Sequence, residues 1–230
     1  MVASPIGNLD DITLRALKVL EEVDVVACED TRHTGQLLSH FNLKKRCIAC
    51  HAHNEEESAK GIIALLDRGE DVAYLSDAGT PGISDPGARL AGAVRESGHK
   101  IVPLPGASAC ITLLSAAGNV GKTFTFEGFL SPKKGRRTKR LAELIGRGEC
   151  FVIYESPFRV LKTLEDIRSC DPAARIVMGR ELTKQFEEIL SLPVDQLIST
   201  LSARPAVKGE FALAVIPGGH DDNAEEDQDA

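Results

Sequence analysis

The sequence contains no apolar run close to the ~18 residues that a membrane-spanning helix requires, so we expect no such helix. It also has no basic segment followed by a short apolar one near its start, and we therefore predict no secretory signal. Its six cysteines are spread through segments predicted to be buried. Buried thiols without an export signal are typical of reduced proteins. These features together predict a cytoplasmic protein.

Motifs of several familiar cofactor and hydrolase sites are also missing. There is no G-x-G-x-x-G fingerprint, so NAD or FAD is not expected as a cofactor. The segment 118–123 ends like a phosphate-binding P-loop, but Ala116 occupies the position of the first glycine and a predicted helix precedes it. No G-x-S-x-G elbow is present, which leaves Ser-His-Asp hydrolysis as an enzyme hypothesis without a motif.

A short Cys/His cluster imitates a metal or haem site. Cys47, Cys50 and His51 match a covalent haem attachment pattern, but that modification needs an export context. With His53 the cluster resembles a zinc site, yet Cys47 and Cys50 would point to opposite faces of the predicted strand. We therefore predict buried strand cysteines and no metal. For His51, His53 and Asn54, contact with a ligand and simple helix capping both remain open.

The negative charge is concentrated at the end of the chain. The formal net charge is −7, and the tail 220–230, whose only apolar residues are two alanines, holds six carboxylates, so the rest of the chain is close to neutral. We predict that this tail is disordered. The body should then be repelled from nucleic acid much less than the overall charge suggests.

Strand-length and helix-length apolar segments alternate, which indicates βαβ units and a parallel sheet in the first half. Predicted strands are 24–29, 46–50, 72–76, 100–104, 124–128, 150–155, 175–178, 186–192 and 210–216. The break at 118–122 predicts an N-terminal α/β domain at 1–117, a linker at 118–123, and a C-terminal α/β domain at 124–219. Only three residues precede Ser4 and Pro5, so a first strand there would be short.

Three loops marked by glycine or proline follow predicted strands of the first domain: 5–8, 77–87 and 105–109. The middle loop is the longest and stiffest, with three glycines, two prolines and two carboxylates. Because parallel strands end at one edge of a sheet, we expect these loops to form a single pocket. Asp77 could meet a cationic group, and Ser108 stands near a helix N-terminus suited to a carboxylate. The pattern predicts a small ligand with amine, carboxylate and hydroxyl groups.

The second domain carries charged residues at two strand ends, 154–159 and 179–184, for which ordinary ion pairing and a functional site both remain open. Six positive charges also fall within eight residues, and no carboxylate interrupts them before Glu143. A solvated helix face is one interpretation, but on a nearly neutral body a contact with a nucleic-acid backbone is favoured. The predicted RNA contacts in this run are Lys133, Lys134, Arg136, Arg137, Lys139 and Arg140.

Several motifs together resemble the tetrapyrrole-methylase superfamily, and within it the branch that methylates small-subunit ribosomal RNA at ribose. They are PIGN (5–8), CEDTRHT (28–34), HxHNE (51–55), SDAGTPGISDPG (76–87), PGASA (105–109), FEGFL (126–130), YESPFR (154–159) and RELTK (180–184). The central loop and CEDTRHT are the most specific of these, whereas PGASA alone would be weak. The motifs extend over nearly the whole chain to about residue 217.

The resemblance implies a fold and a cofactor. Its fold is α/β, with a parallel-sheet N-terminal domain, a mixed-sheet C-terminal domain and a cofactor cleft between them, and its members are usually homodimers. The cofactor implied is S-adenosylmethionine. Tetrapyrrole relatives have a G-D-P type first loop, and Gly7-Asn8 in that place favours the RNA branch. The implied cofactor contacts are Pro5, Gly7, Asn8, Asp77, Gly79, Ile83, Ser108, Ala109, Tyr154, Leu182 and Ala212.

By the same resemblance, the substrate would be a cytidine 2′-hydroxyl in small-subunit (16S) ribosomal RNA. A sulfonium already activates its methyl group, so catalysis should consist mainly of alignment in a dry site, without a metal. We hypothesise that Glu155 or Asp30 accepts or steers the hydroxyl proton, and that Arg32, Arg159 and Lys184 hold phosphates. The competing classes are a porphyrinoid C-methyltransferase and a non-catalytic RNA-binding module.

Overall fold

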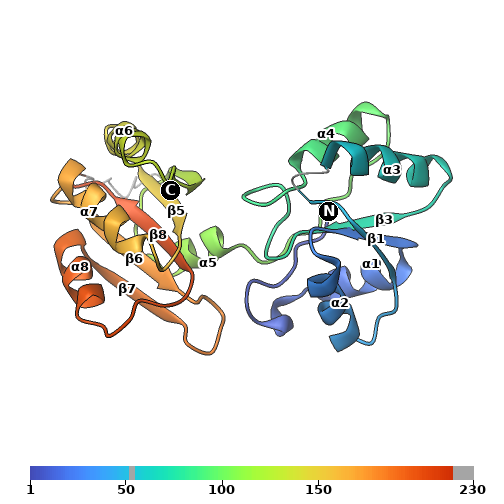
Figure 1. Cartoon of the computed structure of the whole chain (residues 1–230), viewed down its shortest axis with the longest axis horizontal. Coiled ribbons are helices and arrows are strands. Elements are labelled where there is room, and N and C mark those ends of the chain that lie inside the picture. Colours follow the sequence, from blue (N-terminus) through green and yellow to red (C-terminus); the bar gives the residue numbers. More distant parts are fainter. Residues whose placement is uncertain (52–54, 220–230) are drawn as a thin grey trace, which may run out of the picture. The chain divides into compact units, whose positions relative to one another are not determined.

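The structure, a computed structural model, describes residues 1–51 and 55–219. The chain folds into two units, Met1–Ser108 and Ala109–Ala230, referred to here as unit 1 and unit 2. Each unit has its own sheet, as the colours of Figure 1 show along the chain. The predicted tail at 220–230, together with His53 and Asn54, lies outside the described residues. Across the described ranges, every helix is too short or too polar to span a bilayer.

The sheet of unit 1 is parallel, as the alternation of elements predicts. Its strand order is β2-β1-β3, and both pairings are parallel. The elements are the 3-10 turn Leu9–Asp11, α1 (Leu14–Glu22), β1 (Val25–Cys28), α2 (Thr31–His40), β2 (Arg46–Ala49), α3 (Glu55–Asp67), β3 (Val72–Leu75) and α4 (Ala88–Glu96).

Two further segments extend this sheet by single bridges. Val2 pairs in parallel with Leu75 and with Leu104. The predicted strand at 100–104 is therefore reduced to one bridge, and the short first strand to another. Proline has no N–H to give to a ladder, and prolines at 5, 103 and 105 flank both bridges, so neither segment continues as a strand.

Helices cover both faces of the unit 1 sheet, which explains its uninterrupted apolar strands. On one face Val26 and Leu75 pack with Leu20 of α1 and with α2. On the other face Ala27 and Tyr74 pack with α3 and α4. Figure 1 shows α1 and α2 on one side of the strands and α3 and α4 on the other. Helices thus cover both faces, so a ligand site in this unit is expected at the loops that follow the strand ends.

Unit 2 has a mixed sheet of order β4-β5-β8-β6-β7, as the resemblance implies. β4 and β5 are parallel, and every other pairing is antiparallel. The elements are α5 (Ala109–Ser115), β4 (Phe124–Phe129), α6 (Lys134–Ile145), β5 (Cys150–Glu155), α7 (Val160–Cys170), β6 (Arg175–Arg180), β7 (Glu188–Pro193), α8 (Val194–Ser202) and β8 (Phe211–Ile216).

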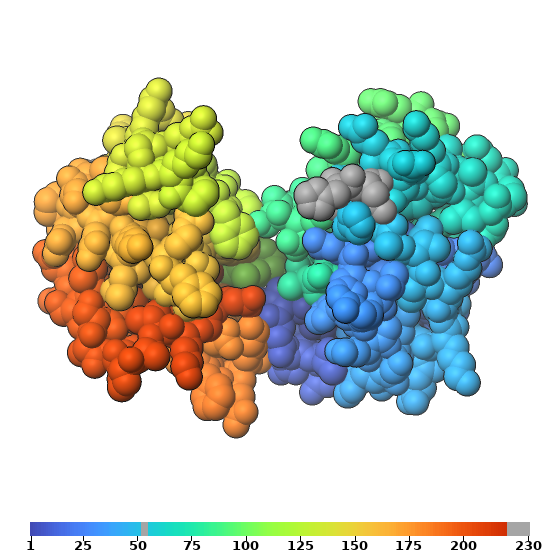
Figure 2. Space-filling model, viewed as in Figure 1, coloured from blue at the N-terminus to red at the C-terminus, as the bar shows by residue number. Residues whose placement is uncertain are grey.

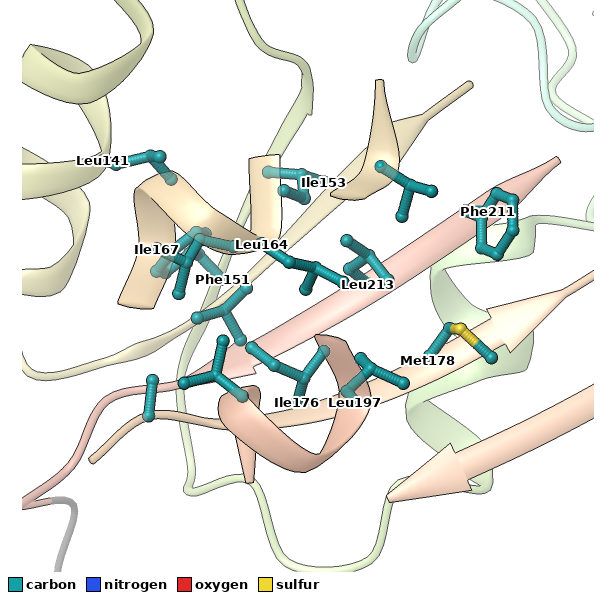
Figure 3. Close-up of a cluster of buried hydrophobic side chains, with 14 of the residues drawn as sticks. Leu141, Phe151, Ile153, Leu164, Ile167, Ile176, Met178, Leu197, Phe211 and Leu213 are labelled. Atoms are coloured by element: carbon teal, nitrogen blue, oxygen red, sulfur yellow. The ribbon is translucent and has the colours of Figure 1, made fainter. Parts of the chain in front are cut away.

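The main core of unit 2 lies between this sheet and the helices α6, α7 and α8. Figure 3 shows Leu141, Leu164 and Leu197 from the three helices meeting alternate residues of the strands, including Ile153 and Leu213. The members of this core recur at helical spacing on α6, α7 and α8 and at every second position on β5, β6 and β8.

The helix α5 packs on β8 and β6 and therefore belongs to unit 2. Leu113 of α5 lies against Gly179, on the sheet face opposite to the one that carries Met178. The two units thus divide between Ser108 and Ala109, ahead of the linker predicted at 118–123. The glycines at 118 and 121 mark the turn between α5 and β4, and both have positive φ angles.

Candidate functional site

The three predicted loops of unit 1 do lie together. Ser4 and Gly79 exchange two backbone hydrogen bonds of 3.0 Å, which join the first loop to the central one. The Thr80 hydroxyl donates to the Ala107 carbonyl at 3.0 Å, which joins the central loop to the third. The three loops thus meet at one edge of the sheet, and a single pocket formed by them stays a prediction.

Glycine is required where these loops touch. Gly79 has a φ of 76°, and a side chain there would meet Ile6 and the Ala107 carbonyl at 3.2 and 3.3 Å. At Gly106 an added Cβ would lie 2.6 Å from the Cβ of Ala3, so only glycine permits this approach. The loops are packed backbone against backbone, which fixes the path of each.

A buried carboxylate that sequence reasoning missed holds the end of the central loop. Glu55 accepts hydrogen bonds from the backbone N–H groups of Gly87 and Leu90, at 2.9 and 3.0 Å. It thereby caps the N-terminus of α4, which has no side-chain cap of its own. The only signal in the sequence was the place of Glu55 in the HxHNE motif, and nothing there indicated a contact with residues 87–90.

Carboxylates gather beside the converging loops. Asp77 accepts the backbone N–H of Asp30 at 3.1 Å, at the carboxyl ends of β3 and β1. Burial raises the pKa of Glu29, and the charges of Asp77 and Asp85 raise it further. Burial, followed by the charge of Asp77, also raises the pKa of Asp85. A cluster of like charges in a partly buried place favours the approach of a cation.

This cluster makes a stability prediction for Glu29→Gln. A carboxyl whose pKa is raised on folding destabilises the fold when it is ionised, and the cost disappears below the pKa of the unfolded chain. The variant should therefore unfold at higher denaturant than the parent at pH 7, and the difference should vanish below about pH 4. Urea unfolding at the two pH values measures this. An equal or lower midpoint at pH 7 would contradict the assignment.

The predicted cofactor contacts of unit 1 fall into two groups. Pro5 and Gly79 are buried, and Asp77 and Ser108 are half-buried, all around the junction of the three loops. The remaining three are exposed: Ile83 in the central loop, and Gly7 and Asn8 in the first loop. The Asn8 side chain accepts the Asp10 N–H and so caps the 3-10 turn.

In unit 2 the predicted contacts also lie side by side. Tyr154 and Gly179 are both register partners of Ala212 on the neighbouring strands. Leu182 folds back over Gly179, where an added Cβ would be 2.8 Å from its side chain. The Tyr154 hydroxyl accepts the Cys110 N–H at 2.9 Å, which places the start of α5, and with it Ala109, at the same location.

A cavity of about 480 Å³ also borders the central loop, but it contains none of these predicted contacts. Its lining includes Thr80, Pro81, Gly87, Arg95 and Pro103. This cavity is therefore separate from the predicted cofactor site, which lies at the junction of the three loops.

Both carboxylates predicted to act on the proton are engaged by neighbours. Glu155 is 2% exposed, accepts hydrogen bonds from the Ser156 N–H and the Thr163 hydroxyl, each at 2.8 Å, and forms an ion pair with Arg159 at 3.2 Å. Asp30 caps α2, and hydrogen bonds from the Arg32 guanidinium and N–H lower its pKa to about 2. A carboxylate with so low a pKa is a weak base while that pairing lasts.

The six basic residues at 133–140 differ in burial and pairing, so they cannot all contact RNA in the same way. Arg137 is 6% exposed, donates to Asp166 at 2.7 Å and to the Pro132 carbonyl, and so is not an RNA contact, contrary to the sequence prediction. Arg140 pairs with Glu127 and Glu143 at 2.7 and 3.1 Å, which offsets its charge. The exposed residues that remain are named here the basic strip: Lys133, Lys134, Arg136 and Lys139.

Arg159 and Lys184 also form ion pairs with carboxylates of unit 2. Arg159 donates to the Leu130 carbonyl at 2.8 Å as well as pairing with Glu155. Lys184 lies between Glu181 and Glu210, at 3.0 and 2.7 Å. Their charges are already compensated. Arg32 pairs with Asp30, and with a side chain 88% exposed it is more exposed than Arg159 (28%) or Lys184 (30%).

The Cys/His cluster does not form a metal centre in the part of the chain that the structure describes. All six cysteines are free thiols, and Cys50 is buried just beyond the end of β2. Among residues 1–51 and 55–219, no three His, Cys, Asp or Glu side chains are grouped so that they could hold a metal ion.

Comparison with known proteins matches this geometry to one family. The model of the tetrapyrrole (corrin/porphyrin) methylases fits residues 1–198. The ribosomal RNA small subunit methyltransferase I of Neisseria meningitidis serogroup B is 45% identical over 94% of this chain and 75% of its own. The protein of the same name from Pseudomonas aeruginosa is 48% identical over 86% of this chain and 70% of its own.

Solved structures agree on the fold. The methyltransferase CobJ superposes with a TM-score of 0.65 at 20% identity, over 93% of this chain and 94% of its own. A uroporphyrin-III-C-methyltransferase from Thermus thermophilus superposes with a TM-score of 0.62 at 20% identity, over 93% and 91%. At this identity the likeness concerns the fold alone, whereas the family model and the relatives extend over most of the sequence. The chain belongs to the tetrapyrrole methylase family.

Proposed function

We propose that this protein transfers the methyl group of S-adenosylmethionine to small-subunit ribosomal RNA, at the 2′-hydroxyl of a cytidine. The observation that carries the proposal is the identity of about 45% over 94% of the chain with relatives named ribosomal RNA small subunit methyltransferase I. The chain is thus an S-adenosylmethionine-dependent methyltransferase, and a cytoplasmic location follows from a ribosomal substrate. The two solved neighbours, both at 20% identity, support the fold and say nothing of the substrate of this chain.

The residues of unit 1 suit this cofactor chemically. S-adenosylmethionine carries a sulfonium, an ammonium, a carboxylate and ribose hydroxyls, and its sulfonium supplies an activated methyl group. The carboxylates at Glu29, Asp77 and Asp85 suit its positive charges and hydroxyls. Glycines 79 and 106 let the three loops pack closely, which fixes the edge of the sheet at which the cofactor would bind. The proposed contacts in this unit are Pro5, Gly7, Asn8, Asp77, Gly79, Ile83 and Ser108.

In unit 2 the proposed cofactor contacts are Ala109, Tyr154, Leu182 and Ala212, and their proximity to one another supports the proposal. Ala212 is the register partner of both Tyr154 and Gly179, and Leu182 packs over Gly179. The proposed phosphate contacts are Arg32, Arg159, Lys184 and the basic strip. The resemblance also implies a homodimer, which is part of the same proposal. Light scattering tests it by measuring the molar mass in solution.

The chain's own contribution to the chemistry is alignment and a proton acceptor. A ribose hydroxyl is a poor nucleophile until it loses its proton. Of the two candidate carboxylates, Asp30 is the better placed, because its partner Arg32 is largely exposed and can exchange to an RNA phosphate. That exchange would release Asp30 and raise its pKa. Glu155, buried with three partners, would instead hold Arg159 in position.

Asp30→Asn should therefore lower the rate of methyl transfer by about 10²-fold, since general-base assistance is worth ~10²–10⁴-fold. S-adenosylmethionine affinity should be unchanged, because the asparagine keeps an oxygen that can cap α2. Single-turnover kinetics with small ribosomal subunits measure the rate. Glu155→Gln is the comparison, and normal methylation by both variants would remove the base assignment.

The proposed function itself is tested by the identity of the product. Small subunits lacking the modification are incubated with the protein and S-adenosylmethionine, and the RNA is digested to nucleosides for mass spectrometry. We expect one 2′-O-methylcytidine per subunit. A methyl group on a base would refute the ribose assignment, and no methylation of RNA would refute the proposal.

A further inference from the structure

Two phenylalanine side chains of unit 2 are exposed at one edge of its sheet. Phe129 ends β4 and is 62% exposed, and Phe158 follows β5 and is 90% exposed. β4 and β5 are adjacent parallel strands, so both side chains lie at carboxyl ends on the same edge. An aromatic ring exposed at the end of each of two neighbouring strands offers an apolar surface that a ligand can cover.

The position of Phe129 depends on an irregularity of β4. The register with β5 shifts between Phe126 and Gly128, and Gly128 has a φ of 70°. In a regular strand Phe126 and Phe129 would point to opposite faces, since they are three residues apart. With the bulge both rings meet Tyr154 edge-on, at centroid distances of 5.1 and 5.8 Å. The bulge thus turns Phe129 onto the same face as Tyr154.

Hydrogen bonds join the segment that contains Phe158 to the segment that leads into the basic strip. Arg159 donates to the Leu130 and Ser131 carbonyls at 2.8 and 3.4 Å. Those two residues lie between Phe129 and Lys133, the first residue of the basic strip. Figure 2 shows the yellow-green atoms of the α6 region bordering the gold atoms of the segment after β5. Exposed rings and positive charges that form no ion pair with the described residues are therefore neighbours within one unit.

We propose that Phe129 and Phe158 form a stacking platform for unpaired bases of the RNA substrate, while the basic strip contacts the adjoining phosphates. This inference rests on the proposed function and specifies its substrate as a single-stranded segment. Bases of a duplex are stacked on one another and expose no ring face, whereas bases in loops can stack on aromatic side chains. The cations beside the rings favour a polyanion over a neutral protein surface as the occupant.

Binding of the full-length protein to a fluorescently labelled 12-nucleotide single-stranded RNA, and to a duplex of the same length, tests the platform. Phe158→Ala should weaken binding to the single strand about tenfold, the size expected for loss of one stacked base. The slope of affinity against salt should not change. Phe158→Tyr should restore the affinity. Phe124→Ala, at the opposite end of β4 and also exposed, is the matched control and should bind like the parent.

Substitutions in the basic strip should change the salt dependence of RNA binding, unlike Phe158→Ala. Lys133→Ala with Lys134→Ala should lower the salt slope by about 0.7 for each phosphate that is no longer neutralised.

If the parent binds the single strand and Phe158→Ala binds equally well, the platform is wrong although the proposed function stands. If Phe158→Ala changes the oligomeric state in light scattering but not the RNA affinity, the ring belongs to a protein interface and the platform is again wrong. If the parent binds no RNA and methylates no subunit, the proposed function itself fails.

Discussion

Replacing Arg137 by alanine should lower the free energy of unfolding by about 3–5 kcal/mol, because it leaves a buried carboxylate without its partner. The Arg137 Nε lies 2.7 Å from an Asp166 carboxylate oxygen, and the two side chains are 7% and 9% exposed. The pair joins α6 to α7. Urea denaturation of the two proteins measures the difference, and a decrease below about 1 kcal/mol would contradict the structural assignment.

The neighbouring residue gives the matched control. Arg136 is exposed on the same turn of α6, and Arg136→Ala should change stability by less than about 0.5 kcal/mol. It should instead weaken RNA binding and reduce its salt dependence. If Arg137→Ala fails to fold, the double variant Arg137→Met with Asp166→Leu should recover most of the stability, since apolar residues often replace a buried ion pair without cost.

Asp77→Asn should weaken S-adenosylmethionine binding by roughly 10- to 100-fold, the decrease expected when a hydrogen bond to a charged group becomes neutral. Asp77 stands at the carboxyl end of β3, and one of its oxygens accepts the Asp30 N–H. Asparagine keeps an oxygen for that hydrogen bond, so the fold should persist while the negative charge is removed. Isothermal titration calorimetry measures the dissociation constant.

Asp67→Asn provides the control for this experiment. Asp67 ends α3 and carries a side chain 65% exposed, paired with His99, away from the loop junction. Removal of its charge should leave cofactor binding unchanged. Equal affinities for the parent and Asp77→Asn would show that the carboxylate cluster of unit 1 does not contact the cofactor.

Local signals were sufficient for most of the fold. The strands β1, β2 and β3 fall within the predicted ranges, because each is a short apolar run in a sheet covered on both faces. The convergence of the three loops also followed from one rule, that parallel strands end at a common edge. The strand predicted at 100–104 is the exception. Its prolines left the apolar pattern intact while removing the donors that a ladder needs.

The contacts that the sequence did not indicate are those between residues distant along the chain. Glu55 caps α4 from a helix that begins 32 residues before Gly87, and Asp166 neutralises Arg137 from the next helix. A run of positive charges says nothing of which members face inward, so the run predicted an RNA contact at Arg137 although this residue is buried. The glycines at 118 and 121 marked a break correctly, but a turn and a boundary between units have the same composition.

The central claim is that the methyl group goes from S-adenosylmethionine to ribosomal RNA. The most direct test offers the protein S-adenosylmethionine labelled with tritium in its methyl group, together with small ribosomal subunits lacking the modification, and in a parallel reaction a porphyrinoid acceptor. We predict stoichiometric label in the RNA and none in the porphyrinoid. Label in the porphyrinoid alone, or in neither acceptor, would contradict the account.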